Sequence, residues 1–123
     1  MLLVAAALTI AVGLMHSILG GKRLIQPILA MDGLPIILGS ANNTRLTLAV
    51  GWHMLTFTWW GMAAIMIHLH YTSEGVGTAF LSMIAILFGL SGLIALIASR
   101  GRHRSWIFFL PISAIAAYSA LPA

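Results

Sequence analysis

The chain has 123 residues and a formal net charge of +4; 61% of its residues are hydrophobic and only 7% are charged. Soluble domains carry about 25% charged residues, so this composition excludes an ordinary soluble fold and predicts a single all-α integral membrane domain, residues 1–123. The chain contains no cysteine, which excludes disulfides, thiolate nucleophiles and iron–sulfur clusters.

Four apolar segments are each long enough, at 1.5 Å per residue, to cross a hydrocarbon layer about 30 Å thick. The first is followed rather than preceded by basic residues, Lys22 and Arg23. A cleavable signal peptide has the opposite order, so we expect a retained helix. The short connections 71–75 and 100–104 predict antiparallel neighbours in a four-transmembrane-helix bundle. The predicted spans are about 2–19, 46–69, 76–98 and 105–121.

The one long connection, residues 20–44, is apolar in its middle, but Pro27, Gly33 and Pro35 divide it into pieces too short to cross the membrane. We expect it to form an interfacial amphipathic loop, with a helix lying on the membrane surface and an extended return to the second span.

The basic residues all fall in or beside the two connections on one side of the predicted bundle. The positive-inside rule makes that side cytoplasmic, which places both termini outside in a multi-pass plasma (inner) membrane protein. Because these residues flank apolar runs instead of sharing a wettable face, we expect no nucleic-acid partner. The residues are Lys22, Arg23, Arg45, Arg100, Arg102 and Arg104.

Small and polar residues recur at helical spacing on each predicted span, which is the pattern of helix–helix contacts in lipid. The pattern predicts a compact left-handed bundle in which large apolar side chains face the acyl chains. The four sets are Ala6, Thr9, Gly13, His16 and Gly20; Ala49, His53, Thr56, Trp60 and Ala63; Ser82, Ala85, Gly89, Gly92 and Ser99; and Trp106, Phe109, Ser113, Ala116 and Ala120.

His16 and His53 are the ionisable residues predicted deepest in the membrane, roughly 9–12 Å inside the cytoplasmic boundary. One interpretation is that they ligate haem b, or a transition metal with His103 as a third ligand. A second is that they carry a proton, because histidine titrates near neutral pH. The simplest is that each donates one hydrogen bond to a hydroxyl or carbonyl group and holds the first two spans together.

Trp59 and Trp60 lie 14 and 15 residues beyond Arg45, so they cannot both belong to an interfacial aromatic belt. A buried tryptophan needs a partner for its N–H group. We interpret the pair either as the wall of a pocket for a flat apolar ligand such as a quinone, porphyrin or lipid tail, or as bulk packing against the third span.

A second histidine group, His68, His70 and Glu74, lies at the outer end of the second span. It is either a surface copper or zinc site or a set of headgroup-level side chains. The only other acid, Asp32, is predicted on the opposite side of the membrane, so a Ser-His-Asp arrangement is excluded. No phosphate-binding loop is present, and we expect no enzymatic activity.

The lead functional prediction is a non-enzymatic accessory protein or apolar-ligand-binding component of a membrane. The alternatives are a haem- or metal-binding redox subunit that uses His16 and His53, and an oligomeric small transporter or channel. The predicted partners are the lipid bilayer and either further copies of the chain or a larger membrane complex.

Overall fold

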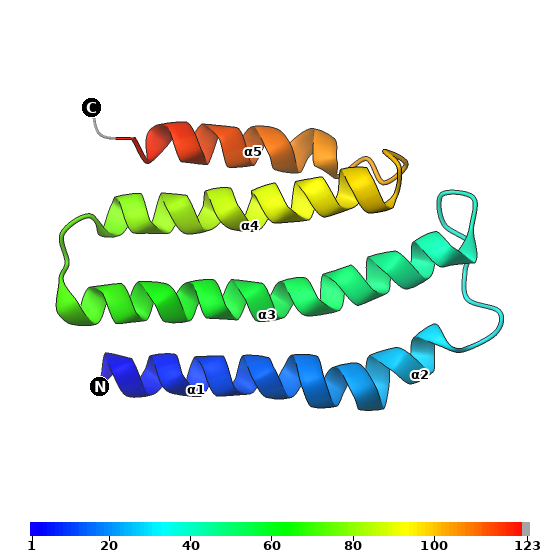
Figure 1. Ribbon diagram of the computed structural model, residues 1–123, viewed down its shortest axis with the longest axis horizontal. Helices are drawn as coiled ribbons and strands as arrows, with labels where there is room; N and C mark the ends of the chain where they lie inside the picture. The colour runs from blue at the N-terminus through cyan, green and yellow to red at the C-terminus, as the bar shows by residue number, and fades with distance from the viewer. Residues whose placement is uncertain (122–123) are drawn as a thin grey trace.

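The computed structural model describes residues 1–121 as an all-α arrangement of four antiparallel helical rods, without β-strands in that range (Figure 1). The last two residues of the predicted 1–123 domain lie outside it. These four rods are consistent with the predicted number of helices. The N-terminus and the end of α5 lie at the end of the rods that carries the α3–α4 turn (Figure 1). The elements are α1 (Leu2–Met15), η1 (His16–Ile25), α2 (Gln26–Leu29), α3 (Ala41–Tyr71), α4 (Val76–Ala98) and α5 (Trp106–Ser119).

The first rod is longer than expected, because α1, η1 and α2 follow one another without a break as far as Leu29. The helix expected on the membrane surface therefore continues the first rod, and the connection is 30–40 instead of 20–44. The element η1 is a π-helix, and the N–H group of Gln26 reaches back to the carbonyl of Gly21. Pro27 lies in the first turn of α2, where a missing N–H group is tolerated.

Polar side chains fix the start of α3. Ser40 is its N-cap, and the Ser40 hydroxyl accepts a hydrogen bond from the N–H group of Asn43 at 3.3 Å. The Asn43 amide donates to the Leu38 carbonyl at 3.0 Å, and Asn43 is buried. Arg45 donates to the Leu29 carbonyl at 2.7 Å, which satisfies a carbonyl group at the end of the first rod.

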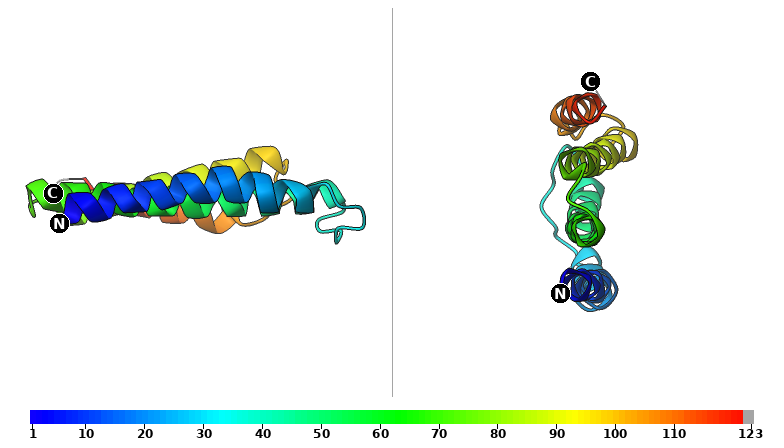
Figure 2. Two further views of the ribbon diagram at one scale, coloured as in Figure 1. Left: turned by 90° about the horizontal axis from the view of Figure 1, so that it is seen from below. Right: turned by 90° about the vertical axis from the view of Figure 1, so that its left-hand side faces the viewer.

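The rods form one layer. Within residues 1–121 the first rod packs only on α3, α3 packs also on α4, and α4 packs also on α5. Figure 2 shows the row end-on and edge-on. The four rods therefore form an open row instead of the predicted compact bundle. The spacing of small residues identifies which face of a helix is in contact, but not whether the row closes into a bundle. The small core consists of Ala6, Ile25, Ala63 and Ala116.

The α4–α5 pair confirms the predicted stripes on those helices. Gly92 and Gly89 bring α4 against Leu110 and Ser113 of α5, since a Cβ atom at either glycine would lie within 3 Å of those side chains. The Ser113 hydroxyl donates to the Ala85 carbonyl at 2.6 Å. Small residues at these positions therefore allow close backbone approach.

By length and composition, two of the rods are suited to crossing a membrane: Leu2–Leu29, with a mean hydropathy of 2.2, and α4, with 2.5. Only 11% and 6% of their apolar windows are buried, whereas the core helix of a soluble protein is mostly buried. Helix α5 is apolar but has 14 residues, about 21 Å of helix. Large apolar side chains are exposed on all four rods, among them Leu8, Phe57, Ile86 and Phe108.

Candidate functional site

Three side chains of α3, one turn apart, donate hydrogen bonds to backbone carbonyls of the first rod. We call this set the donor ladder. Because the donors are spaced by four residues and the acceptors by three in the opposite direction, the ladder fixes the antiparallel register of the two helices. Its rungs are Trp52 to His16 at 3.1 Å, Thr56 to Gly13 at 3.4 Å, and Trp60 to Ile10 at 3.3 Å.

Glycines of the first rod make room for the aromatic rings of the ladder. A Cβ atom at Gly13 would lie 2.6 Å from the indole nitrogen of Trp60, and one at Gly20 would lie 2.6 Å from a ring carbon of Trp52. The two bulky side chains of α3 therefore lie directly over the glycines of the predicted stripe. A tryptophan is accommodated at position 60, far from either end of α3, because its N–H group bonds to a carbonyl of the neighbouring helix.

His16, the first residue of η1, contacts α3 through both its ring and its backbone. Its Nε2 lies 3.2 Å from the Trp52 carbonyl, and because a carbonyl only accepts, Nε2 carries the proton. The ring stacks on the Trp52 indole with centroids 3.9 Å apart and planes at 14°. The edge of Trp59 approaches the same imidazole at 5.0 Å.

His53 belongs to a chain of hydroxyl groups that sequence reasoning missed. Its Nδ1 lies 2.9 Å from the Ser17 hydroxyl, which lies 2.8 Å from the Thr56 hydroxyl. Thr56 donates to the Gly13 carbonyl, so Ser17 donates to Thr56 and the Nδ1–H group of His53 donates to Ser17. The signal available was Ser17, which lies four residues after Gly13 on the stripe face.

Removing the Ser17 hydroxyl tests the hydrogen bonds that join His53, Ser17 and Thr56. Ser17→Ala removes the hydroxyl between His53 and Thr56, and Thr56 is only 2% exposed. We expect unfolding free energy to fall by about 1 kcal/mol, because a partly buried polar pair loses its link. Thermal unfolding of the purified protein measures the change. Ser73→Ala, in the exposed α3–α4 turn, is the control, and equal stability losses in both variants would contradict the assigned chain.

The arrangement of His16 and His53 does not fit an axial pair for haem b or a two-histidine metal site. The Nε2 of His16 is engaged by a backbone carbonyl and its ring face is covered by Trp52, while His53 points its Nδ1 at Ser17. His103, the predicted third ligand, lies in the turn before α5 and lines a cavity between α3, α4 and α5. We therefore derive no redox step through these residues.

The group of His68, His70 and Glu74 lies at the turn between α3 and α4. His68 donates from Nε2 to the backbone carbonyl of Glu74 at 2.8 Å, and the N–H group of Glu74 bonds to the Thr72 hydroxyl. His70 packs edge-on against Tyr71. Over residues 1–121, no group of three or more His, Asp or Glu residues could hold a metal ion. His68 and the Glu74 backbone thus close the α3–α4 turn.

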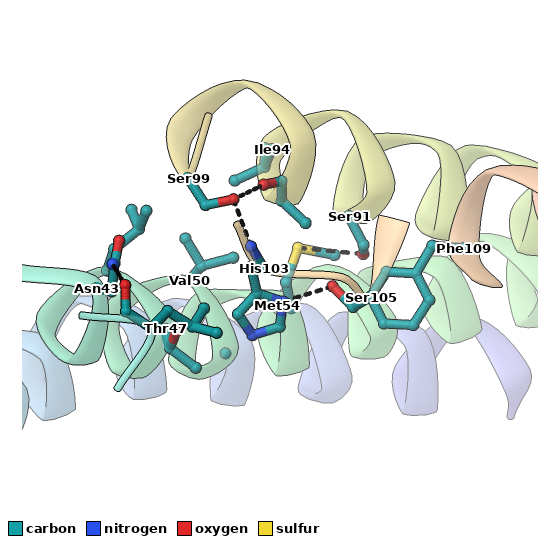
Figure 3. A pocket seen from close by; sticks show the side chains of 14 residues that line it. Asn43, Thr47, Val50, Met54, Ser91, Ile94, Ser99, His103, Ser105 and Phe109 are labelled. Atoms are coloured by element: carbon teal, nitrogen blue, oxygen red, sulfur yellow. Dashed lines mark hydrogen bonds between the residues drawn. The ribbon is translucent and has the colours of Figure 1, made fainter. Parts of the chain in front are cut away.

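A cavity of about 240 Å³ lies on the other side of α3 from the donor ladder, between α3, α4 and the start of α5 (Figure 3). We call it the α3–α5 pocket. Its walls are mostly aliphatic and aromatic, and polar groups gather where the α4–α5 turn meets α3. The apolar wall includes Leu46, Val50, Met54, Ile94, Ala95 and Phe109.

The α4–α5 turn positions the polar end of the pocket. The Ser99 hydroxyl accepts the backbone N–H group of His103 at 2.9 Å, and the His103 Nδ1 lies 2.7 Å from the Ser105 hydroxyl. Figure 3 shows the imidazole extending from this turn between α4 and α3. The turn thereby presents the His103 imidazole and the Ser105 hydroxyl to a space whose walls are mostly apolar.

The sequence suggested that Trp59 and Trp60 either line a ligand pocket or pack against the third span. The structure places both toward the first rod, and neither lines the α3–α5 pocket. The pocket uses a different face of α3. A signal for it was present: Asn43, Thr47, Val50 and Met54 are spaced by four, three and four residues, which is the spacing of one helix face.

Comparison of the chain with protein-family models, with curated proteins and with solved structures finds no match.

Proposed function

We propose that the chain is a small polytopic membrane protein that binds an apolar ligand in the α3–α5 pocket and has no catalytic role of its own. The observation that carries this proposal is the pocket, which has mostly apolar walls and a polar end that includes Ser99, His103 and Ser105. Ligand sites typically combine predominantly apolar walls with a few placed polar groups.

The exposed apolar surface supports insertion into lipid. A layer one helix thick has two broad apolar faces, and the two most apolar rods bury little of their surface inside the chain. Water would make this arrangement unfavourable, whereas acyl chains solvate both faces. The basic residues of the 100–104 turn support a cytoplasmic orientation for that end. A short α5 is accommodated by local thinning of the bilayer.

The size of the pocket narrows the class of ligand. Sites that enclose a whole small molecule have volumes of roughly 300–1,000 Å³. The α3–α5 pocket is about 240 Å³, so it suits an alkyl chain or a single ring better than a porphyrin. His103 and Ser105 at the polar end provide hydrogen-bonding groups for the polar terminus of such a ligand.

A photoreactive fatty alcohol tests this function. We expect hexadecanol carrying a diazirine on its chain to crosslink to residues of the α3–α5 pocket in the protein held in phosphatidylcholine nanodiscs. Ala95→Phe places a phenyl ring in the wall of the pocket and should reduce this crosslinking at least several-fold, because the ring occupies the chain's space. Mass spectrometry of the crosslinked peptides measures both the site and the yield.

The control variant is Ala98→Phe. Ala98 lies one turn further along α4, is exposed and does not line the pocket. Crosslinking should keep its wild-type yield in Ala98→Phe. If both variants label alike, or if wild-type labels are spread over the outer faces of the layer, then the probe reports bulk lipid and the proposed binding site is wrong.

A further inference from the structure

The turn between α4 and α5 lines a second hollow, which we call the arginine hollow. It is an open depression in the surface, lined by Leu38, Arg100, Gly101, Arg102 and Arg104. Leu38 also lines the α3–α5 pocket, so the two spaces adjoin at this side chain. A cationic space thus lies beside the apolar one, at the end of the rods where His103 forms the polar wall.

The turn is ordered by its own hydrogen bonds. The N–H group of Gly101 bonds to the Leu96 carbonyl at 2.7 Å, which ends α4, and the Trp106 indole donates to the Gly101 carbonyl at 3.3 Å. Arg100 has a φ of 52°, in the left-handed region that side chains seldom adopt. The three arginine side chains are therefore carried by a backbone of defined conformation. The backbone of Arg100 is in an unfavourable conformation.

The hollow has no acidic side chain in its lining. The only acids of the chain are Asp32 and Glu74, and neither belongs to it. Three arginines in a five-residue turn repel one another unless an anion is present. The positive-inside rule accounts for basic residues on this side of the membrane. It does not account for three of them lining one hollow that adjoins an apolar cavity.

We propose that the α3–α5 pocket and the arginine hollow together bind one anionic lipid, with its phosphate on the arginine turn and part of an acyl chain in the pocket. This inference rests on the proposed function and specifies its ligand. The pocket is too small for a whole lipid, so a chain would enter and the head would stay outside, beside Leu38. Arginine suits that head because its planar fork binds phosphate oxygens in pairs.

The experiment compares two probes that share one chain: the diazirine-labelled hexadecanol used above and its phosphate monoester. In phosphatidylcholine nanodiscs we expect the phosphate to label the pocket at a concentration roughly 10- to 100-fold lower than the alcohol, because each basic residue near the headgroups adds attraction. The variant Arg102→Gln with Arg104→Gln should remove most of this preference and leave labelling by the alcohol unchanged.

The matched control is Lys22→Gln with Arg23→Gln, which removes the same charge from exposed positions of η1 outside both spaces. It should keep the preference for the phosphate. Equal loss in the two double variants would show a diffuse surface potential and overturn the lipid site. Displacement of the phosphate probe by millimolar inorganic phosphate would identify a free-anion site, which also overturns it.

The two proposals fail in distinguishable ways. If the wild-type pocket is labelled by the alcohol and the phosphate at the same concentration, the anionic lipid is excluded while the apolar pocket stands. If neither probe labels the pocket, both proposals are wrong. Circular dichroism of each double variant verifies that helix content is retained, so that a loss of labelling reports the site and not unfolding.

Discussion

Trp52→Ala is expected to destabilise the protein by about 3–5 kcal/mol, the largest effect of any single substitution proposed here. Trp52 stacks on His16 at 3.9 Å, donates to the His16 carbonyl and accepts a hydrogen bond from the His16 ring on its own carbonyl. Truncation removes the first two interactions and opens a cavity over Gly20. Unfolding monitored by circular dichroism in detergent measures the loss.

Trp52→Phe separates the stacking contribution from the hydrogen bond. Phenylalanine keeps an aromatic face for His16 but has no N–H group, so we expect it to retain most of the stability and lose about 1–2 kcal/mol. A loss as large as that of the alanine variant would mean that the ring stacking contributes little. A negligible loss in both variants would contradict the interface between α1 and α3.

Gly13→Leu should separate α1 from α3, with a loss of about 2–4 kcal/mol. A Cβ atom at Gly13 meets the indole nitrogen of Trp60 at 2.6 Å and the Thr56 methyl group at 3.3 Å. Both are members of the donor ladder, and the rigid indole cannot move without losing its bond to the Ile10 carbonyl. A shift in tryptophan fluorescence together with the unfolding midpoint would report the separation.

Gly77→Leu is the control for added bulk on an apolar helix. A Cβ atom there has no neighbour within 4 Å, and the residue is exposed in the first turn of α4. The substitution should be neutral or slightly stabilising, because leucine favours helix more than glycine does. Should Gly13→Leu prove equally harmless, the close contact between Gly13 and Trp60 would not exist in solution.

The helices were predictable because long apolar runs separated by polar, glycine-containing turns leave little choice of secondary structure. The stripe on α1 was also predictable: Gly13 and Gly20 are small where a neighbour's tryptophan needs room. The end of the first rod was not predictable from the sequence. Pro27 reads as a helix breaker, but after a π-helical stretch it occupies a first-turn position, where its missing N–H group is tolerated.

The arrangement of the helices, and with it the pocket, could not be derived from periodicity. A stripe identifies which face of a helix is in contact, but α3 has two such faces, one toward the first rod and one toward α4. The sequence revealed only the face toward the first rod, because Trp60 and His53 are conspicuous there. Val50 and Met54, on the other face, look like ordinary lipid-facing residues. The spatial meeting of Leu38 with the 100–104 turn joins segments that no local pattern connects.

The row of helices is uneven in how firmly its members are joined. Hydrogen bonds and close glycine contacts tie the first rod to α3 and α4 to α5, whereas the contact between α3 and α4 is smaller and has one close glycine approach, Gly61 against Met83. Across residues 1–121 the side-chain hydrogen bond from α4 to the body of α3 is the weak one from Ser91 to the Met54 sulfur, at 3.7 Å. The protein is thus two tight hairpins meeting at a loose joint, and the α3–α5 pocket lies in that joint. A ligand in the pocket would therefore contact both hairpins at once, and would add to the small interface between them.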